Sequence, residues 1–118
     1  METGGYIDGF KEAKRLVSEG RAQLESAERI DLSAETSLFA GAYNLFEKKQ
    51  EMALEKEGIA IEKIMRGLEE YRNLLRYDNT AHFGRIKTAI KYTLDEFSGR
   101  IPGNSCEKYR NALFIGPE

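Results

Sequence analysis

The chain has 118 residues, of which 41% are apolar and 32% are charged, and its formal net charge is −2. This length suits one domain with one core, and so small a net charge identifies no oppositely charged partner. Cys106 is the only cysteine, which excludes an internal disulfide and fits a reducing compartment, so we expect a cytoplasmic location. No stretch is apolar over the length that a secretory signal or a membrane span requires, so no membrane association is expected.

The first predicted helix covers residues 8–29, after a flexible N-terminus over residues 1–7. Two sets of residues recur every seven positions, one large and one small: Phe10, Val17 and Leu24, and Ala13, Gly20 and Ala27. Together they form a stripe with alternating spacings of three and four, which is typical of a helix with one buried face. The small residues predict that a neighbouring helix approaches closely.

A second helix is predicted to begin at Asp31 or Ser33, because both are favourable N-cap residues. Its apolar face is wide and comprises Leu38, Phe39, Ala42, Tyr43, Leu45 and Phe46. Gly58 is a natural stop signal, but no capping residue follows it to start another helix. Two alternatives stay open: one long helix over residues 33–77, which is preferred, or a break at Gly58 that gives a compact bundle.

The clearest helical patterns lie on either side of a predicted turn at residues 78–80. The segment 59–77 has apolar residues spaced 3-4-3-4, and a similar stripe predicts a helix over residues 80–98. From these two stripes we expect five side chains to be deeply buried: Ile64, Leu68, Ile86, Ile90 and Leu94.

The C-terminal part contains the strongest stop signals. Gly99 and the Ile101-Pro102-Gly103 segment end the preceding helix, and Asn104 is predicted to cap a short final helix over residues 105–114. No segment alternates apolar and polar residues with the period of a strand. The predicted fold class is therefore all-α: an antiparallel helical bundle of three to four main helices with a short C-terminal helix. It forms a single domain over residues 1–118, with residues 99–118 as a C-terminal extension.

Few residues are candidates for chemistry. His82 is the single histidine, Cys106 is the single cysteine, and neither belongs to a pair with the spacing of metal ligands. No glycine-rich phosphate loop occurs. We therefore predict no catalytic residue, no metal and no cofactor.

One short segment allows an enzymatic alternative. Arg76 and His82 are separated by five residues, and this spacing is superficially similar to the Arg-x(4–6)-His signature of HEPN-type ribonucleases, which are helical bundles of about this size. In that family the Arg and His meet across a dimer and cleave RNA, so the resemblance implies a ribonuclease that uses Arg76 and His82. It covers seven residues, and Tyr77 stands where the family normally has a polar residue.

Charge is divided unevenly along the chain. Residues 1–70 hold ten Lys or Arg and fifteen Asp or Glu, a net −5, whereas residues 71–110 hold eight and four, a net +4. The basic part is interleaved with tyrosines, which favours nucleic-acid binding as an alternative function. Its possible contacts to an anionic partner are Arg72, Arg76, Arg85, Lys87 and Lys91.

The preferred function is a non-enzymatic protein–protein interaction module, as a self-associating small subunit, an adaptor or a chaperone-like protein. A long helix over residues 33–77 would extend beyond its shorter neighbours and leave part of its apolar stripe bare, and a second copy could cover it. We therefore expect a homodimer, a further protein partner, or both. The C-terminal segment offers another possible interface: Tyr109, Leu113, Phe114 and Ile115.

Overall fold

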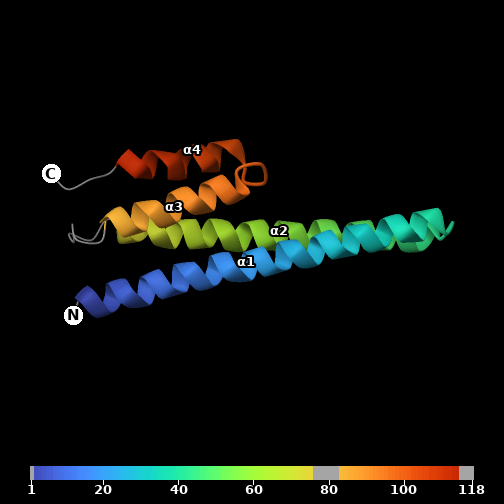
Figure 1. Ribbon diagram of the computed structural model, residues 1–118, viewed down its shortest axis with the longest axis horizontal. Helices are drawn as coiled ribbons and strands as arrows, with labels where there is room; N and C mark the ends of the chain where they lie inside the picture. The colour runs from blue at the N-terminus through green and yellow to red at the C-terminus, as the bar shows by residue number, and fades with distance from the viewer. Residues whose placement is uncertain (1, 76–82, 115–118) are drawn as a thin grey trace.

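The computed structural model describes residues 2–75 and 83–114, with side chains from Asp8 onward. Within these ranges the chain forms four α-helices, a 3-10 helix and no strand, which confirms the predicted all-α class. The elements are α1 (Glu2–Phe39), α2 (Tyr43–Leu74), α3 (Phe83–Phe97), α4 (Gly103–Asn111) and η2 (Ala112–Phe114). Helices α1 and α2 form a long antiparallel hairpin, and α3 and α4 lie along only one half of it (Figure 1).

Helix α1 is much longer than predicted at both ends. It begins at Glu2, although residues 1–7 were expected to be flexible, and it continues through Asp31 and Ser33 to Phe39. The predicted helix start at Asp31 or Ser33 is wrong because the seven-residue repeat continues to Ala34, which is buried against α2. A continued seam outweighs the capping preference of two polar residues.

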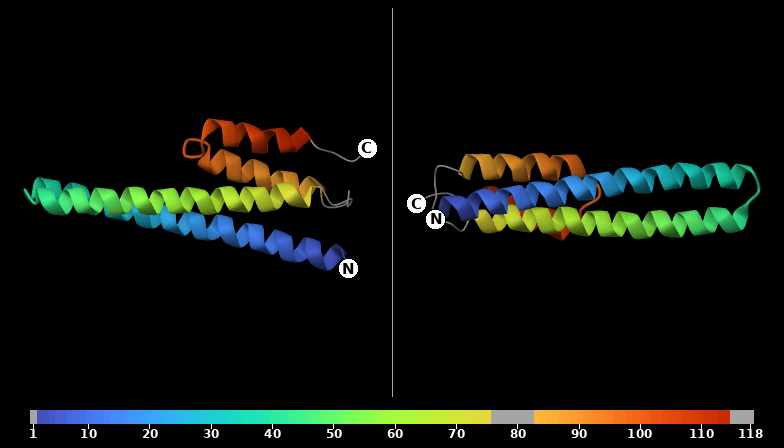
Figure 2. Two further views of the ribbon diagram at one scale, coloured as in Figure 1. Left: turned by 180° about the vertical axis from the view of Figure 1, so that it is seen from behind. Right: turned by 90° about the horizontal axis from the view of Figure 1, so that it is seen from below.

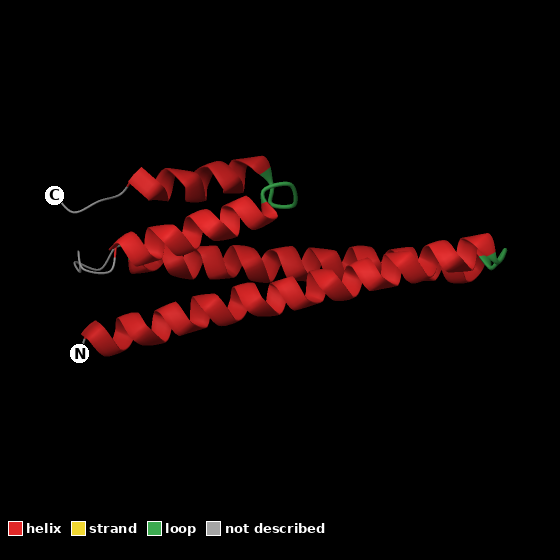
Figure 3. Ribbon diagram, in the orientation of Figure 1, coloured by secondary structure: helices red, strands yellow, loops and turns green. Residues whose placement is uncertain are grey.

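The chain reverses instead at residues 40–42. Gly41 has a φ of 79°, its N–H donates to the carbonyl of Leu38 (3.0 Å), and the N–H of Ala42 donates to the carbonyl of Ser37 (2.9 Å). These two bonds and the left-handed glycine define a Schellman cap, which ends the helix and satisfies its last carbonyls. Because the turn needs only three residues, α1 and α2 run antiparallel as immediate neighbours (Figure 3).

Helix α2 runs through Gly58 without a break, so the preferred continuous helix is confirmed at this position. It begins at Tyr43 rather than at residue 33, however, and α1, with 38 residues, is longer than α2, with 32, rather than shorter. The predicted bare stripe therefore cannot arise from a lack of length in α1. Any exposed apolar stripe must instead lie on the faces of α1 and α2 that point away from their mutual contact.

Small residues form the seam between α1 and α2, as predicted from Ala13, Gly20 and Ala27. A Cβ atom added to Gly20 would lie 2.8 Å from the carbonyl oxygen of Ala60, and one added to Gly67 would lie 3.0 Å from that of Ala13. Both distances are shorter than ordinary van der Waals contact, so only glycine lets the two backbones come this close.

The core lies where α3 covers the hairpin. The largest fully buried side chains are the five predicted ones: Ile64, Leu68, Ile86, Ile90 and Leu94. The apolar cluster around them extends along the hairpin only as far as Leu24 of α1 and Ala60 of α2. At this limit Arg21 binds Glu96 through two bonds of 2.6 Å, and Arg100 binds Glu28 at 2.6 Å, so two ion pairs tie the end of α3 to α1.

The short C-terminal helix is confirmed, with a different start. Pro102 is the N-cap residue of α4 and the helix begins at Gly103, so Asn104 lies inside the first turn rather than at the cap. The Asn104 side chain accepts a hydrogen bond from the N–H of its neighbour Ser105 (2.9 Å). Proline at this position leaves no unpaired N–H, which explains why it serves as the boundary.

Candidate interaction surface

One end of the hairpin extends beyond α3 and α4 (Figure 2). We call residues 29–57 the hairpin end, because Glu28 is the last α1 residue bonded to the turn after α3, and Gly58 is the first α2 residue that lines the groove beside α4. Ten large apolar side chains are exposed among the described residues, and seven of them belong to the hairpin end: Leu32, Leu38, Phe39, Tyr43, Leu45, Met52 and Leu54. This concentration makes the hairpin end the candidate interaction surface.

Small and polar residues hold the two helices together there. Ala34, Ser37 and Ala53 are buried, and the Nζ of Lys49 donates to the Oγ atoms of Ser33 (2.6 Å) and Ser37 (3.1 Å). These contacts keep the helices paired but bury little apolar surface. The larger apolar side chains of this region are therefore left facing outward.

The hairpin end has one face that continues the surface under α3. On α1, Leu24 and Glu28 line the surface at the end of α3, and residues seven and fourteen positions later on a paired helix keep the same side. Asp31 and Leu38 follow Leu24 by seven and fourteen residues, and Glu35 follows Glu28 by seven, so these three residues share that side of α1. On α2, Tyr71 lies against Ala89 and Tyr92 of α3.

Glu57 and Tyr43 precede Tyr71 by fourteen and twenty-eight residues, which are multiples of seven, so they lie on the same side of α2 as Tyr71. Glu47 and Leu54 flank them at helical spacings of four and three. We call the combined set the α3-side face: Asp31, Glu35, Leu38, Tyr43, Glu47, Leu54 and Glu57. It holds four carboxylates, three large apolar side chains and no Lys or Arg.

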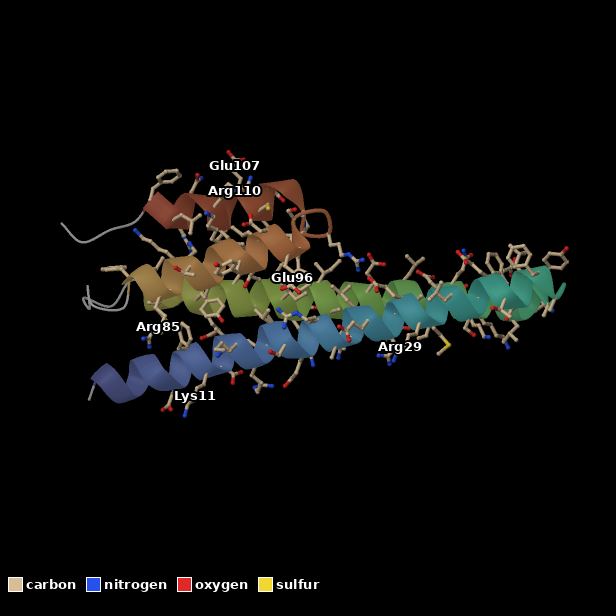
Figure 4. All side chains as sticks on the ribbon, in the orientation of Figure 1. Lys11, Arg29, Arg85, Glu96, Glu107 and Arg110 are labelled. Carbon is tan, nitrogen blue, oxygen red and sulfur yellow. The ribbon has the colours of Figure 1, made fainter. Side chains whose placement is uncertain are left out.

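The opposite side of the hairpin end has a different character. Leu45, Met52 and Ile59 recur every seven residues and are exposed, and Lys49 and Lys56 lie between them. Lys56 donates to Ser26 of α1 (3.1 Å), which places this row over the other edge of the hairpin. Arg29 also projects away from α2 (Figure 4). Lys49 and Lys56 thus lie on a different surface of the hairpin end from the α3-side carboxylates.

The predicted contacts to an anionic partner divide between two helices. Arg72 of α2 pairs with Glu69 at 3.3 Å, and Arg76 lies outside the described residues. Arg85 and Lys91 are exposed on α3 with no ion pair to another described residue, and Lys87 lies over the ring of Phe83 at 5.8 Å. Helix α3 therefore gathers three of the five predicted cations, as the start of α3 in Figure 4 shows for Arg85.

From the sequence, Tyr92 counted only as one of the tyrosines interleaved with the basic part, and it was not among the predicted contacts to an anionic partner. It lies seven residues after Arg85, so both project from one side of α3, and its side chain is 70% exposed. An exposed tyrosine beside cations is a common composition for a protein-binding surface. The periodicity of residues 83–97 already contained this signal, because Tyr92 falls off the apolar stripe.

The C-terminal interface prediction has a mixed outcome. Tyr109 is buried and its hydroxyl donates to the carbonyl of Met65 (3.3 Å), so it is a core residue that joins α4 to α2. Leu113 packs half-buried against the same core, whereas Phe114 is 84% exposed. Ile115 lies outside the described residues. Of the described members, only Phe114 presents most of its side chain to solvent.

The environment of Tyr109 predicts a measurable titration. Burial raises the pKa of its phenol to about 12, and the negative charge of Glu69 acts in the same direction. The neutral phenol is therefore favoured in the folded state: its contribution to stability is complete below about pH 10 and is lost as the pH rises through about 12. Ultraviolet difference titration against Tyr109→Phe should show one tyrosine ionising near pH 12, and ionisation of all tyrosines near pH 10 would contradict this.

The residues predicted for chemistry do not assemble into a site among those described. Arg76 and His82, the pair that resembles the ribonuclease signature, lie outside the described residues, and Cys106 is buried. Over residues 2–75 and 83–114, no group of three or more His, Cys, Asp or Glu side chains could hold a metal ion. In the same ranges, no helix combines the length and apolar character needed to cross a membrane.

Comparison of the chain with protein-family models, with curated proteins and with solved structures gives no match.

Proposed function

We propose that the chain is a helical protein–protein interaction module that associates with itself through the hairpin end. The observation that supports this proposal is the division of the molecule into two halves. One half has α3 over the hairpin and a closed apolar core, and the other half carries seven exposed large apolar side chains on two helices alone. Exposed apolar patches of this kind commonly mark interaction surfaces.

A second copy is the simplest molecule that can complete the bundle. Two paired helices bury only the side chains between them, whereas a third or fourth helix closes a core on their outer faces. Soluble homo-oligomers are most often two-fold dimers, in which each copy contributes the same surface. The hairpin end supplies such a surface in every copy.

The test is the solution mass as a function of concentration. We expect light scattering to give twice the chain mass of 13.4 kDa at tens of micromolar, with dissociation on dilution. A reducing agent should leave this mass unchanged, because Cys106 is buried. A mass of one chain at every concentration up to about 100 μM, far above the dissociation constants of specific dimers, would refute self-association.

A further inference from the structure

We propose that α3 of each copy seats on the α3-side face of the other copy's hairpin end, so that one dimer contains this contact twice. The inference rests on the proposed self-association and adds the partner surface. It makes α3, rather than a second hairpin end, the element that covers the exposed apolar side chains.

The shape of the chain allows this reciprocal contact. Helix α3 has 15 residues and therefore a length of about 22 Å, and the uncovered stretch of α2 from Tyr43 to Glu57 has the same number of residues. Each copy thus offers one α3 and one bare stretch of matching length, one after the other along the hairpin (Figure 2). A two-fold rotation places each α3 on the bare stretch of the other copy and closes the assembly at two chains.

The charges of the two surfaces are complementary. The α3-side face carries Asp31, Glu35, Glu47 and Glu57, and no ion pair joins these four carboxylates to another described residue. The first nine residues of α3 carry Arg85, Lys87 and Lys91 and no acid. Contact of opposite charges steers association and fixes its register, whereas the lysines on the opposite side of the hairpin end would repel α3.

Apolar contacts are available at the same place. Tyr92 is 70% exposed at the edge of α3 beside α1, where it lines a groove with Lys14 and Arg21 of its own copy. In the dimer it would meet Leu38, Tyr43 and Leu54 among the carboxylates. Tyrosine and arginine are the residue types that most often dominate binding energy when they are seated in an apolar surface surrounded by polar groups. Arg85 and Tyr92, on one side of α3, supply both.

Charge reversal on either surface tests whether α3 of one copy binds the α3-side face of the other. In one variant, Arg85→Glu and Lys91→Glu make α3 acidic, so α3 and the α3-side face repel each other in the homodimer. In a second variant, Asp31→Lys, Glu35→Lys, Glu47→Lys and Glu57→Lys make the face basic, with the same result. We expect each variant alone, at low salt, to dimerise about tenfold or more weakly than the original chain.

Mixing the two variants gives the decisive result. A mixed dimer contains two contacts. In one, the acidic α3 of the first variant meets the basic face of the second variant. In the other, the original α3 of the second variant meets the original acidic face of the first. Sedimentation of the equimolar mixture should therefore show a heterodimer with an affinity within about threefold of the original dimer. Absence of the heterodimer, when both variants retain helical circular dichroism, would overturn the seating of α3.

A matched control separates the seating from the effect of net charge. Lys11→Glu with Arg110→Glu changes the net charge by the same amount as the α3 variant, but both residues are exposed and lie outside both α3 and the hairpin end. We expect this control to dimerise like the original chain. Suppose that the original chain dimerises but the control loses as much affinity as the α3 variant. Then the proposed contact of α3 with the α3-side face is wrong, although self-association stands. If the original chain is monomeric, both proposals are wrong.

Discussion

Replacement of Leu68 by alanine should lower the free energy of unfolding by about 2–5 kcal/mol. Leu68 is completely buried within the cluster that joins α2 and α3, and its truncation removes apolar contacts and leaves a cavity. A domain of this size is stable by only about 5–15 kcal/mol, so the loss is a large fraction of the total. Urea or thermal unfolding followed by circular dichroism measures it.

Leu54→Ala is the matched control for this experiment. Leu54 lies on the same helix two heptads earlier, so it keeps the same register as Leu68, but α3 does not extend over it and its side chain is 69% exposed. In dilute, monomeric protein we expect its replacement to change the unfolding free energy by no more than about 0.5 kcal/mol. Equal losses at the two leucines would mean that the core extends into the hairpin end.

Addition of a single methyl group to the α1–α2 seam should also destabilise the fold, by about 1–3 kcal/mol. At Gly20 the new Cβ would lie 2.5 Å from Cγ1 of Ile64 and 2.8 Å from the backbone oxygen of Ala60. The oxygen cannot move aside unless the helices separate. The intrinsic gain of about 1 kcal/mol for alanine over glycine in a helix therefore does not prevent a net loss at Gly20→Ala.

Gly58→Ala provides a control of opposite sign. Gly58 is also inside α2, but a Cβ there would meet nothing within 4 Å. Only the helix propensity remains, so we expect stabilisation by about 0.5–1 kcal/mol. Thermal melts of Gly20→Ala and Gly58→Ala should shift in opposite directions, and parallel stabilisation would show that the helices do not approach closely at Gly20.

The repeating apolar positions were sufficient to predict most of the core. The seven-residue spacing of Ala13, Gly20 and Ala27 predicted a close helix–helix seam, and the stripes around Leu68 and Ile90 predicted the deepest side chains. These predictions succeed because burial of one face imposes a period on the sequence regardless of where a helix begins or ends.

Helix boundaries were harder to predict, because two local signals competed. Asp31 and Ser33 favour a helix start, whereas Gly41 favours a helix end, and only the tertiary seam at Ala34 decides between them. The misplaced turn also explains why the wide apolar face predicted around it is wrong. Leu38, Phe39, Tyr43 and Leu45 lie on two different helices next to the turn and are exposed.

The candidate surface was only partly visible in the sequence. The bare apolar stripe expected on a long helix predicted self-association, but not which surfaces meet. That depends on the position at which α3 ends along the hairpin, near Arg21 and Glu28, and this position is set by contacts between segments more than seventy residues apart. Residue spacing within one helix contains no information about such contacts.

The location of the core at the open end of the hairpin has a consequence for the order of folding. Close to Gly41 the two helices meet through Ala34, Ser37 and Ala53, so closure of the turn gains little apolar contact. The main cluster begins at Leu24 and Ala60, which are 36 residues apart in the chain, and a loop of that length must close before these contacts form. We therefore expect that the hairpin does not form progressively from its turn, and that docking of α2 and α3 at the far end limits the rate of folding. On this basis Leu68→Ala should mainly slow folding, as measured by stopped-flow mixing.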